Sequence, residues 1–450
     1  MINKNNLIYD FLSRNFWFTL SVIIVLISGL LNQYFPILLS FILITVLYYF
    51  KSITKIIIFF IICLVLSDNL SNSLKYFEIV RIICIITIFF YSIYSAKLTK
   101  SLVNNLLAIL PFWFIILLSL SNSPTLSQSF FRSISYILLP VISFITIKDE
   151  IRKYNNYLIS DLLIFSTLIL IIGNLAYFLL PDYFIIYGEG ASLRFSGLFG
   201  NPNGQGIYCF LLIPINSYAI KAKMISKPVG NIILITTFIS IILSGSRTAL
   251  GCSILFYIYW SINNFNLYLR AFLKITLPMI AIIFASVTIN IVKQNKDISQ
   301  RLRFETLADA GGRLSSWKWG ILQIKEHPFI GAGLKYDQTL YQTKISAFIR
   351  NNYRGMNASY SGILALILDT GIIGFIFFNI FIFYSFYQFI DRTIIVPLLI
   401  TFNISITFES WIVATLNPYT ILFFLQITLY QNVSTNKAKT GSNKYNFLIH

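Results

Sequence analysis

Long runs of apolar residues constrain the fold of this chain more than any other feature. Runs such as Leu102–Leu120, Tyr157–Leu180 and Phe272–Val292 approach the ~20 residues that a helix needs to cross ~30 Å of hydrocarbon. They do not alternate polar and apolar residues, as the strands of a membrane barrel would. Because backbone polar groups must be satisfied within the hydrocarbon, the runs predict transmembrane helices. The expected fold class is therefore an all-α, polytopic integral membrane protein.

Composition excludes the main alternatives. The 450 residues are 57% hydrophobic and only 11% charged, whereas soluble domains carry about 25% charged residues. The net charge of +18 would suit a nucleic-acid binder, but the basic residues lie mostly in short connections between apolar runs, so no nucleic-acid partner is expected. The cysteines lie in or beside apolar runs at unrelated spacings and predict neither a metal site nor disulfides: Cys63, Cys84, Cys209 and Cys252.

Fourteen apolar segments divide the chain. Several are short, so a bundle of about 12–14 transmembrane helices is expected. The segments are approximately 16–31, 35–50, 55–67, 77–95, 102–120, 130–147, 157–180, 203–220, 229–243, 248–262, 271–292, 358–389, 394–409 and 417–431. The first lacks an Ala-x-Ala-like exit and is expected to be a retained span. The polar, basic tail from about Asn432 is expected to be disordered.

The distribution of basic residues predicts the orientation. With the N-terminus in the cytoplasm, the even-numbered connections face the cytoplasm, and they carry clusters such as Lys221, Lys223 and Lys227. Cytoplasmic loops are enriched in Lys and Arg, so both termini are expected to be cytoplasmic. The long hydrophilic segment 293–357 is then external, because long loops translocate regardless of charge.

That segment carries its own helical pattern. Leu314, Trp317, Ile321 and Ile324 recur at helical spacing within 311–328, and proline at the end of this stretch stops the helix. We expect an amphipathic helix along the outer face of the membrane, with its tryptophans at the interface.

Charged residues at the ends of spans are candidates for function, because charge near hydrocarbon is costly. Guanidinium groups bind phosphate oxygens in a bidentate way, so outward-facing arginines suit an anionic ligand. Simpler roles stay open: Glu78 can pair with Arg81, and Arg132 can snorkel to the interface. The charged residues near outer helix ends are Glu78, Arg81, Arg132, Arg194, Arg247 and Glu409, with Asp369 deeper in its helix.

Arg194 and Arg247 are the strongest of these candidates. Arg194 opens the Gly-, Asn- and Pro-rich stretch 194–206, which enters the membrane, and Arg247 lies in the break Ser-Gly-Ser-Arg-Thr-Ala at 244–249. Irregular backbone at membrane depth survives only where protein buries it or where it lines an aqueous cavity. The two arginines therefore predict a binding cavity, although each alone would also fit an interfacial anchor.

Five motifs occur together in the second half of the chain. They are Arg-Phe-Ser-Gly-Leu-Phe-Gly-Asn-Pro-Asn (194–203), Ser-Gly-Ser-Arg-Thr-Ala (244–249), Gly-Arg-Leu-Ser-Ser-Trp (312–317), His-Pro-Phe-Ile-Gly-Ala-Gly (327–333) and Asn-Ala-Ser-Tyr (357–360) followed by Asp-Thr-Gly (369–371). In this order and spacing, over about 190–380, the chain resembles the bacterial O-antigen polymerase and O-antigen ligase family of membrane glycosyltransferases. A vaguer similarity extends to Glu-Ser-Trp at 409–411.

The resemblance implies an enzyme at the outer face of the bacterial cytoplasmic membrane. Such enzymes transfer a glycan from undecaprenyl pyrophosphate to a sugar hydroxyl, without a metal or other cofactor. A flippase and a chain-length regulator are implied as partners. The family-like core is expected over 186–380, between N-terminal helices (1–185), C-terminal helices (381–431) and a cytoplasmic tail (432–450). Arg194 and Arg247 match the family's pyrophosphate-binding arginines, and the other residues expected to bind substrate are Asn203, Arg313, Asn357 and Tyr360.

The chain departs from the ligase pattern at one position. Ligases carry a histidine directly before the Asn-Ala-Ser-Tyr motif as the favoured general base, and here that position is Met356. This favours a polymerase over a ligase. Candidates for the base are Glu189, Asp309, Asp337 and His327, although the histidine of a His-Pro turn is more often structural. A transporter of lipid-linked glycans and a polymerase of another surface polysaccharide remain alternatives.

Overall fold

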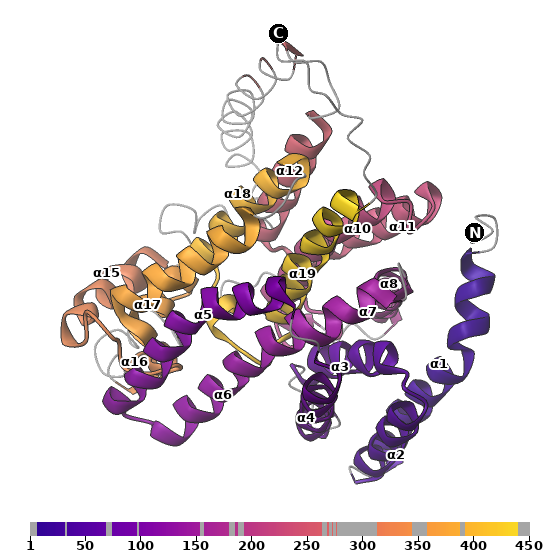
Figure 1. The fold of residues 1–450 in the computed structure, drawn as a ribbon, viewed down its shortest axis with the longest axis horizontal. Helices are drawn as coiled ribbons and strands as arrows, with labels where there is room; N and C mark the ends of the chain where they lie inside the picture. Colours follow the sequence, from indigo (N-terminus) through magenta and orange to yellow (C-terminus); the bar gives the residue numbers. More distant parts are fainter. Residues whose placement is uncertain are drawn as a thin grey trace.

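Helices make up nearly all of the described structure (Figure 1). The computed structural model describes residues 7–31, 34–68, 74–96, 99–153, 157–179, 185–187, 193–262, 268–269, 272, 276, 313–343, 358–387 and 392–439. Within these residues, seven helices are long and apolar enough to cross a membrane, and three shorter apolar helices accompany them. The chain is therefore an all-α, multi-pass membrane protein, as its sequence predicts. Most of the predicted span 271–292 lies outside the described residues.

The first half of the chain forms successive apolar helices whose bounds follow the predicted segments, except that α1 begins at Leu7 and not near residue 16. α6 continues through a π-helical turn, Ser143–Ile147, into α7. The proline at position 140, in the last turn of α6, has no backbone N–H, so the regular hydrogen-bond ladder is interrupted just before this turn. The elements are α1 Leu7–Leu31, α2 Phe35–Tyr49, α3 Ile53–Ser67, α4 Phe77–Ser95, α5 Lys100–Ser119, α6 Leu126–Ile142, α7 Lys148–Lys153 and α8 Tyr157–Leu179.

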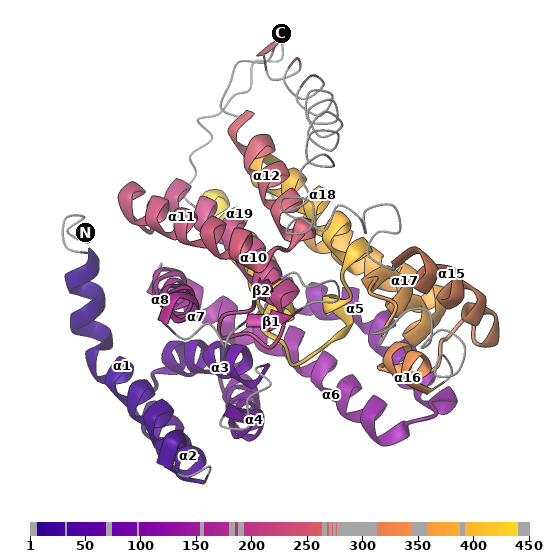
Figure 2. The ribbon, with the colours of Figure 1, turned by 180° about the vertical axis from the view of Figure 1, so that it is seen from behind.

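The second half begins with a short antiparallel hairpin and continues with helices. Figure 2 shows the hairpin beside α10, and its strands pair Ile186 with Arg194. The elements are β1 Ile185–Tyr187, β2 Leu193–Phe195, α10 Pro202–Lys221, α11 Lys227–Ser244, α12 Arg247–Ile262, α15 Arg313–Gln323, α16 Tyr336–Thr343, α17 Gly362–Tyr387, α18 Arg392–Phe408 and α19 Pro418–Lys439.

α10 and α19 form the centre of the bundle, where they pack against each other (Figure 1). Nearly every side chain of α10 from Gly204 to Ala219 is buried, because neighbouring helices surround it. Gln426 of α19 donates to the carbonyl of Leu211 at 2.6 Å, which gives the amide nitrogen of this buried side chain a partner inside the core. α19 continues to Lys439. The expectation that the tail is disordered from about residue 432 is therefore wrong for 432–439.

A second, smaller core joins α15, α16 and the first half of α17. Its buried members include Ala332, Tyr341 and Leu368, and Trp317 and Trp319 pack against them. The ring of Trp319 lies edge-on to Tyr341 at 4.8 Å between centroids. One face of the predicted amphipathic helix therefore packs on protein, while Leu314 and Ile321 of its stripe are exposed; its placement along the outer face of the membrane stays a prediction. An apolar helical stripe predicts burial, but it does not distinguish lipid from protein as the burying partner.

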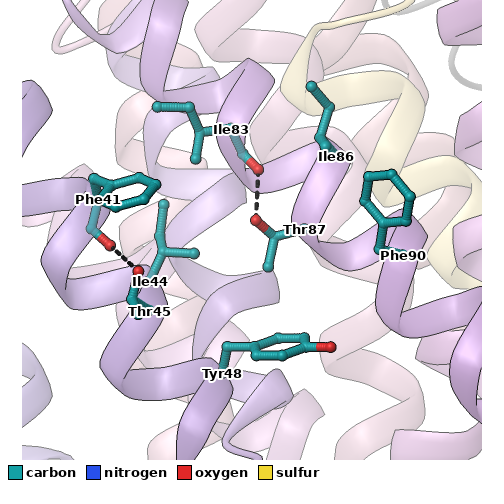
Figure 3. A pocket seen from close by; sticks show the side chains of 8 residues that line it. All are labelled: Phe41, Ile44, Thr45, Tyr48, Ile83, Ile86, Thr87 and Phe90. Atoms are coloured by element: carbon teal, nitrogen blue, oxygen red, sulfur yellow. Dashed lines mark hydrogen bonds between the residues drawn. The ribbon is translucent and has the colours of Figure 1, made fainter.

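An open apolar groove of about 260 Å³ lies between α2 and α4 (Figure 3). The hydroxyls of Thr45 and Thr87 donate to carbonyls one turn earlier on their own helices, so the lining presents mainly hydrocarbon. The groove contains none of the charged residues singled out in the sequence. Its lining residues are Phe41, Ile44, Thr45, Tyr48, Ile83, Ile86, Thr87 and Phe90.

Candidate active site

Arg194 and Asn203 are joined by a hydrogen bond within the polar stretch that precedes α10. Nη2 of Arg194 donates to Oδ1 of Asn203 at 2.5 Å, and its Nε donates to the carbonyl of Ser244 at 3.2 Å. The side chain of Asn201 accepts the backbone N–H of Asn203 at 2.8 Å and caps α10, with proline at the first helical position. The hairpin, the start of α10 and the end of α11 therefore meet at Arg194.

The chain breaks between α11 and α12 at the motif that contains Arg247. Gly245 has a φ of 63°, the left-handed conformation that ends many helices. Ser246 packs against Gly206 of α10, where an added Cβ would lie 2.6 Å from the serine Cβ. α12 then begins at Arg247. The structure thus assigns both motif arginines to one junction: Arg194 bonds to the last residue of α11, and Arg247 starts α12.

Two helix N-termini strengthen the positive potential at this junction. α10 and α12 both begin there, and the first turn of a helix leaves backbone N–H groups without partners inside the helix. These groups and the helix dipole favour anions. We refer to Arg194, Asn203, Arg247 and the two helix starts as the arginine site. Its chemistry suits a phosphate-bearing ligand.

Arg313 forms an ion pair with a glutamate that the sequence did not single out as a binding residue. Its Nη2 lies 2.5 Å from Oε1 of Glu409, which joins the start of α15 to the residue after α18. Burial raises the pKa of Glu409, while Arg313 and Arg194 act in the opposite direction. Arg313 therefore neutralises a buried carboxylate, and Arg194 links this pair electrostatically to the arginine site.

Asp68 and Tyr419 adjoin the same region, and neither was predicted. The phenol of Tyr419 donates to Oδ2 of Asp68 at 3.1 Å. A Cβ added at Gly204 would lie 2.0 Å from that phenol oxygen, so only glycine fits there. Asp68 lies in a short polar stretch between two apolar runs, where the sequence pattern resembles an ordinary loop. The contact with Tyr419 links residues 351 positions apart, so no local pattern reveals it.

Arg81 and Arg132 bind parts of the protein distant in sequence. Nη1 of Arg81 donates to Oγ of Ser67 at 3.0 Å and to the carbonyl of Leu416 at 3.2 Å, which ties α4 to the end of α3 and the approach to α19. Arg132 donates to Oε1 of Gln338 at 2.8 Å, which ties α6 to α16. Both side chains therefore connect helices, while the Glu78 pairing and the snorkelling of Arg132 stay predictions.

The His-Pro-Phe-Ile-Gly-Ala-Gly and Asp-Thr-Gly motifs interlock at a break in α17. Gly371 has φ 70° and ψ 178°, which interrupts the helix. The backbone groups released by the break bond to 328–333: Ala332 and Gly333 donate to the carbonyls at 368 and 369, while the amides at 372 and 373 donate to the carbonyls at 328 and 329. A Cβ at Gly371 would lie 2.1 Å from a backbone oxygen. We call this exchange between 328–333 and 368–373 the Gly371 clasp.

Two buried aspartates extend the clasp toward the Asn-Ala-Ser-Tyr motif. The carboxylate of Asp369 accepts the backbone N–H groups of Lys335 at 3.0 Å and Asp337 at 2.8 Å. Asp337 in turn accepts the backbone N–H of Ser359 at 3.1 Å. Burial raises the pKa of Asp337 to about 6, and the bonds from Ser359 oppose this shift. The next residue, Tyr360, has a φ of 53°, a strained conformation for a tyrosine.

Of the four candidates for the general base, the structure describes two, Asp337 and His327. Asp337 is only 2% exposed and holds the backbone of the motif loop, so its geometry favours a positioning role. His327 begins the turn before the clasp, where its carbonyl accepts the amide of Gly331 at 3.2 Å. Glu189, Asp309 and Asn357 lie outside the described residues, as does Met356.

Metal-ligating side chains do not gather in the part of the chain that the structure describes. There, no group of three or more His, Cys, Asp or Glu residues lies close enough to hold a metal ion. Metal independence stays a prediction for experiment.

Comparison with known families finds one match. Residues 232–379 match the family model described as O-antigen ligase. The match includes Arg247, Arg313 and the Gly371 clasp, and it ends before Glu409. No curated protein matches the chain. The resemblance predicted from the sequence motifs is confirmed over these residues.

Proposed function

Residues 232–379 form an O-antigen ligase family domain, and from this premise we propose that the protein is a membrane glycosyltransferase that polymerises lipid-linked glycan repeat units. The donor glycan is carried on undecaprenyl pyrophosphate, and the acceptor is a sugar hydroxyl of another lipid-linked unit. The reaction takes place at the outer face of the bacterial cytoplasmic membrane. O-antigen or a related surface polysaccharide is the product.

The observation that carries this proposal is the shared junction of Arg194 and Arg247. A pyrophosphate leaving group gains negative charge as its bond to the sugar breaks, and fixed cations stabilise that charge. Arg194 is held by Asn203 and by the end of α11, so its guanidinium is oriented before substrate arrives. Arg247 and the starts of α10 and α12 add further positive potential at the same place.

The residues around the arginine site support the other half of the reaction. Glu409 and Arg313 link the arginine site to α15, and Ser316 of α15 donates to the carbonyl of Ala358 at 3.2 Å. The Asn-Ala-Ser-Tyr loop, including Tyr360, is therefore tied to the same structure. We assign Asn357 and Tyr360 to glycan binding, because amide and phenol groups hydrogen-bond sugar hydroxyls.

A ligase that transfers the finished glycan to lipid A–core is the second candidate, and the description of the matching family favours it. Met356 stands where ligases carry the favoured catalytic histidine. Methionine cannot accept a proton, so polymerisation is the better supported of the two activities.

Deletion of the gene in its native strain separates these activities. If the protein is the polymerase, single repeat units reach the acceptor and long chains disappear from the surface glycan profile. Loss of every unit from the acceptor would instead identify a ligase. Units trapped inside the cell would identify a transporter, and unchanged chains would refute all three. Complementation with the wild-type gene is the control.

A further inference from the structure

Asp68 lies directly beside the arginine site. Its Oδ2 would be 3.6 Å from a Cβ at Gly204, and Gly204 follows Asn203, the partner of Arg194. The side chain is half-buried at the end of α3. The absence of a side chain at Gly204 lets the Tyr419 phenol and Asp68 approach the backbone at the start of α10 closely.

The partners of Asp68 differ from those of the other acids near the site. Glu409 is neutralised by a guanidinium. Asp337 and Asp369 are fully buried and fixed by backbone amides. Asp68 accepts a phenol proton from Tyr419 and a backbone hydrogen bond from Gly200, both of them neutral donors. Of these four acids, Asp68 is the one that is both partly exposed and held by neutral donors, which leaves its carboxylate able to take a proton.

We propose that Asp68 is the general base of the glycosyl transfer, an inference that rests on the proposed function. Its carboxylate removes the proton of the acceptor hydroxyl while that oxygen forms a bond to the anomeric carbon of the donor. The bond from the anomeric carbon to the pyrophosphate oxygen breaks, and the electron pair leaves on the pyrophosphate, beside Arg194 and Arg247. Asp68 then releases the proton to water. This assignment supplies the proton acceptor that Met356 cannot provide.

The surroundings of Asp68 make the proposal testable through pH. Burial raises the pKa of Asp68, while the Tyr419 phenol, the Arg81 guanidinium and the Gly200 amide lower it. Arg81 comes from α4 and is also faced by Glu78. Tyr419 comes from α19 and is also faced by Glu409. A general base acts only when deprotonated, so the rate falls as pH drops through its pKa.

Removing the Tyr419 hydroxyl takes away a donor that stabilises the Asp68 carboxylate. The pKa of Asp68 therefore rises, and the acidic limb of the rate profile in Tyr419→Phe moves to higher pH. Tyr208→Phe is the matched control, because it removes a buried tyrosine hydroxyl that bonds to Ser166 at 2.7 Å. That control leaves the position of the acidic limb unchanged.

The experiment uses the full-length protein in lipid nanodiscs, with undecaprenyl-pyrophosphate repeat units extracted from a polymerase-deletion strain as substrate. Asp68→Asn keeps the size and an acceptor oxygen but cannot take the proton, so chain extension falls by about 10²–10⁴. Donor binding is unchanged, and Asp68→Glu recovers part of the rate. If Asp68 has only a structural role, Asp68→Asn lowers the yield of folded protein, and the acidic limb of the pH–rate profile of Tyr419→Phe does not move.

Near-normal extension by Asp68→Asn overturns the assignment, as does an unshifted acidic limb in Tyr419→Phe. If Asp68→Asn does not fold, the Tyr419→Phe profile decides alone. Failure of the wild-type protein to extend any lipid-linked unit refutes the proposed function itself. Loss of extension in Arg194→Ala together with normal extension in Asp68→Asn leaves that function standing and rejects only Asp68 as its base.

Discussion

The arginine site and the Gly371 clasp both hold charged side chains among apolar helices, yet they satisfy those charges differently. In the clasp, Asp369 is completely buried, and backbone amides of Lys335 and Asp337 bind its two oxygens. In the arginine site, Arg194 is half-buried and donates to a side-chain amide oxygen and to a carbonyl at a helix end.

This difference shows that a charge within an apolar helix is not by itself a sign of catalysis. A buried carboxylate bound by backbone amides fixes two segments relative to each other, because moving either would leave buried amides without acceptors. A half-buried guanidinium beside two helix starts is where we expect an anionic ligand to bind. We therefore expect the type of partner and the degree of exposure to distinguish structural charges from ligand-binding charges in this protein.

Alanine at Arg194 or Arg247 is expected to have the largest effect on activity. Loss of a charge-assisted contact to a developing oxyanion costs about 3–4 kcal/mol, or 10²–10³ in rate. Lysine should restore only part of the rate, because a point charge cannot reproduce the bidentate fork. Glycan chain-length profiles, read beside membrane-fraction blots, measure both activity and abundance. Near-normal chains from both alanine variants at normal abundance would remove the arginine site from the mechanism.

Asp369→Ala should instead act on stability. It leaves the buried amides of Lys335 and Asp337 without their acceptor, at a cost of about 1–3 kcal/mol each. We expect less folded protein and a lower Tm in detergent, with activity per folded molecule reduced far less than in Arg194→Ala. Asp369→Asn should be milder, because it retains one acceptor oxygen. A normal Tm with lost activity would place Asp369 in the reaction and erase the contrast.

Lys318→Ala should change chain extension less than about twofold, because exposed charges contribute little. This lysine is exposed on α15, the helix that starts with Arg313. Lys325→Ala is a matched exposed-charge control on the following turn. A loss comparable to that of Arg194→Ala would show that net positive charge near the site, and not a defined arginine pair, supports activity.

Chelation of divalent cations is expected to leave the rate of chain extension unchanged, the smallest effect among these predictions. A site that stabilises pyrophosphate with arginines and helix starts needs no divalent cation, so extension should survive EDTA. The rate in nanodiscs with and without EDTA tests this. Strong inhibition that Mg²⁺ or Mn²⁺ reverses would show that the arginines are insufficient for the leaving group.

The fold was largely predictable because long apolar runs leave few structural choices. The helix bounds follow the runs closely, including α5, predicted over 102–120 and observed at Lys100–Ser119. The packing partners of each helix were not predictable, because hydrophobic periodicity does not identify what covers a surface. Trp317, for example, lies against Phe408, with ring centroids 5.7 Å apart.

The candidate site was predictable only where its residues lie in local motifs. The polar breaks at Arg194 and Arg247 stand out in an apolar chain. The contacts that complete the site do not stand out in the sequence, because their partners are distant. Arg313, for example, pairs with Glu409, 96 positions away. Asp68 depends on an even more distant contact, with Tyr419. Such pairs follow from helix packing, and a single sequence carries no direct signal of that packing.

The Gly371 clasp also bears on how the protein is inserted into the membrane. α17 cannot satisfy its own backbone at the break, so its hydrogen bonding is complete only when residues 328–333 have docked. Ribosomes make 328–333 before 368–373, because synthesis runs from the N-terminus. The docking partner is therefore already present when the second half of α17 leaves the translocon. A variant with a lengthened connection between these segments would expose unsatisfied backbone to lipid for longer during biogenesis, and membrane proteases would have more time to degrade it.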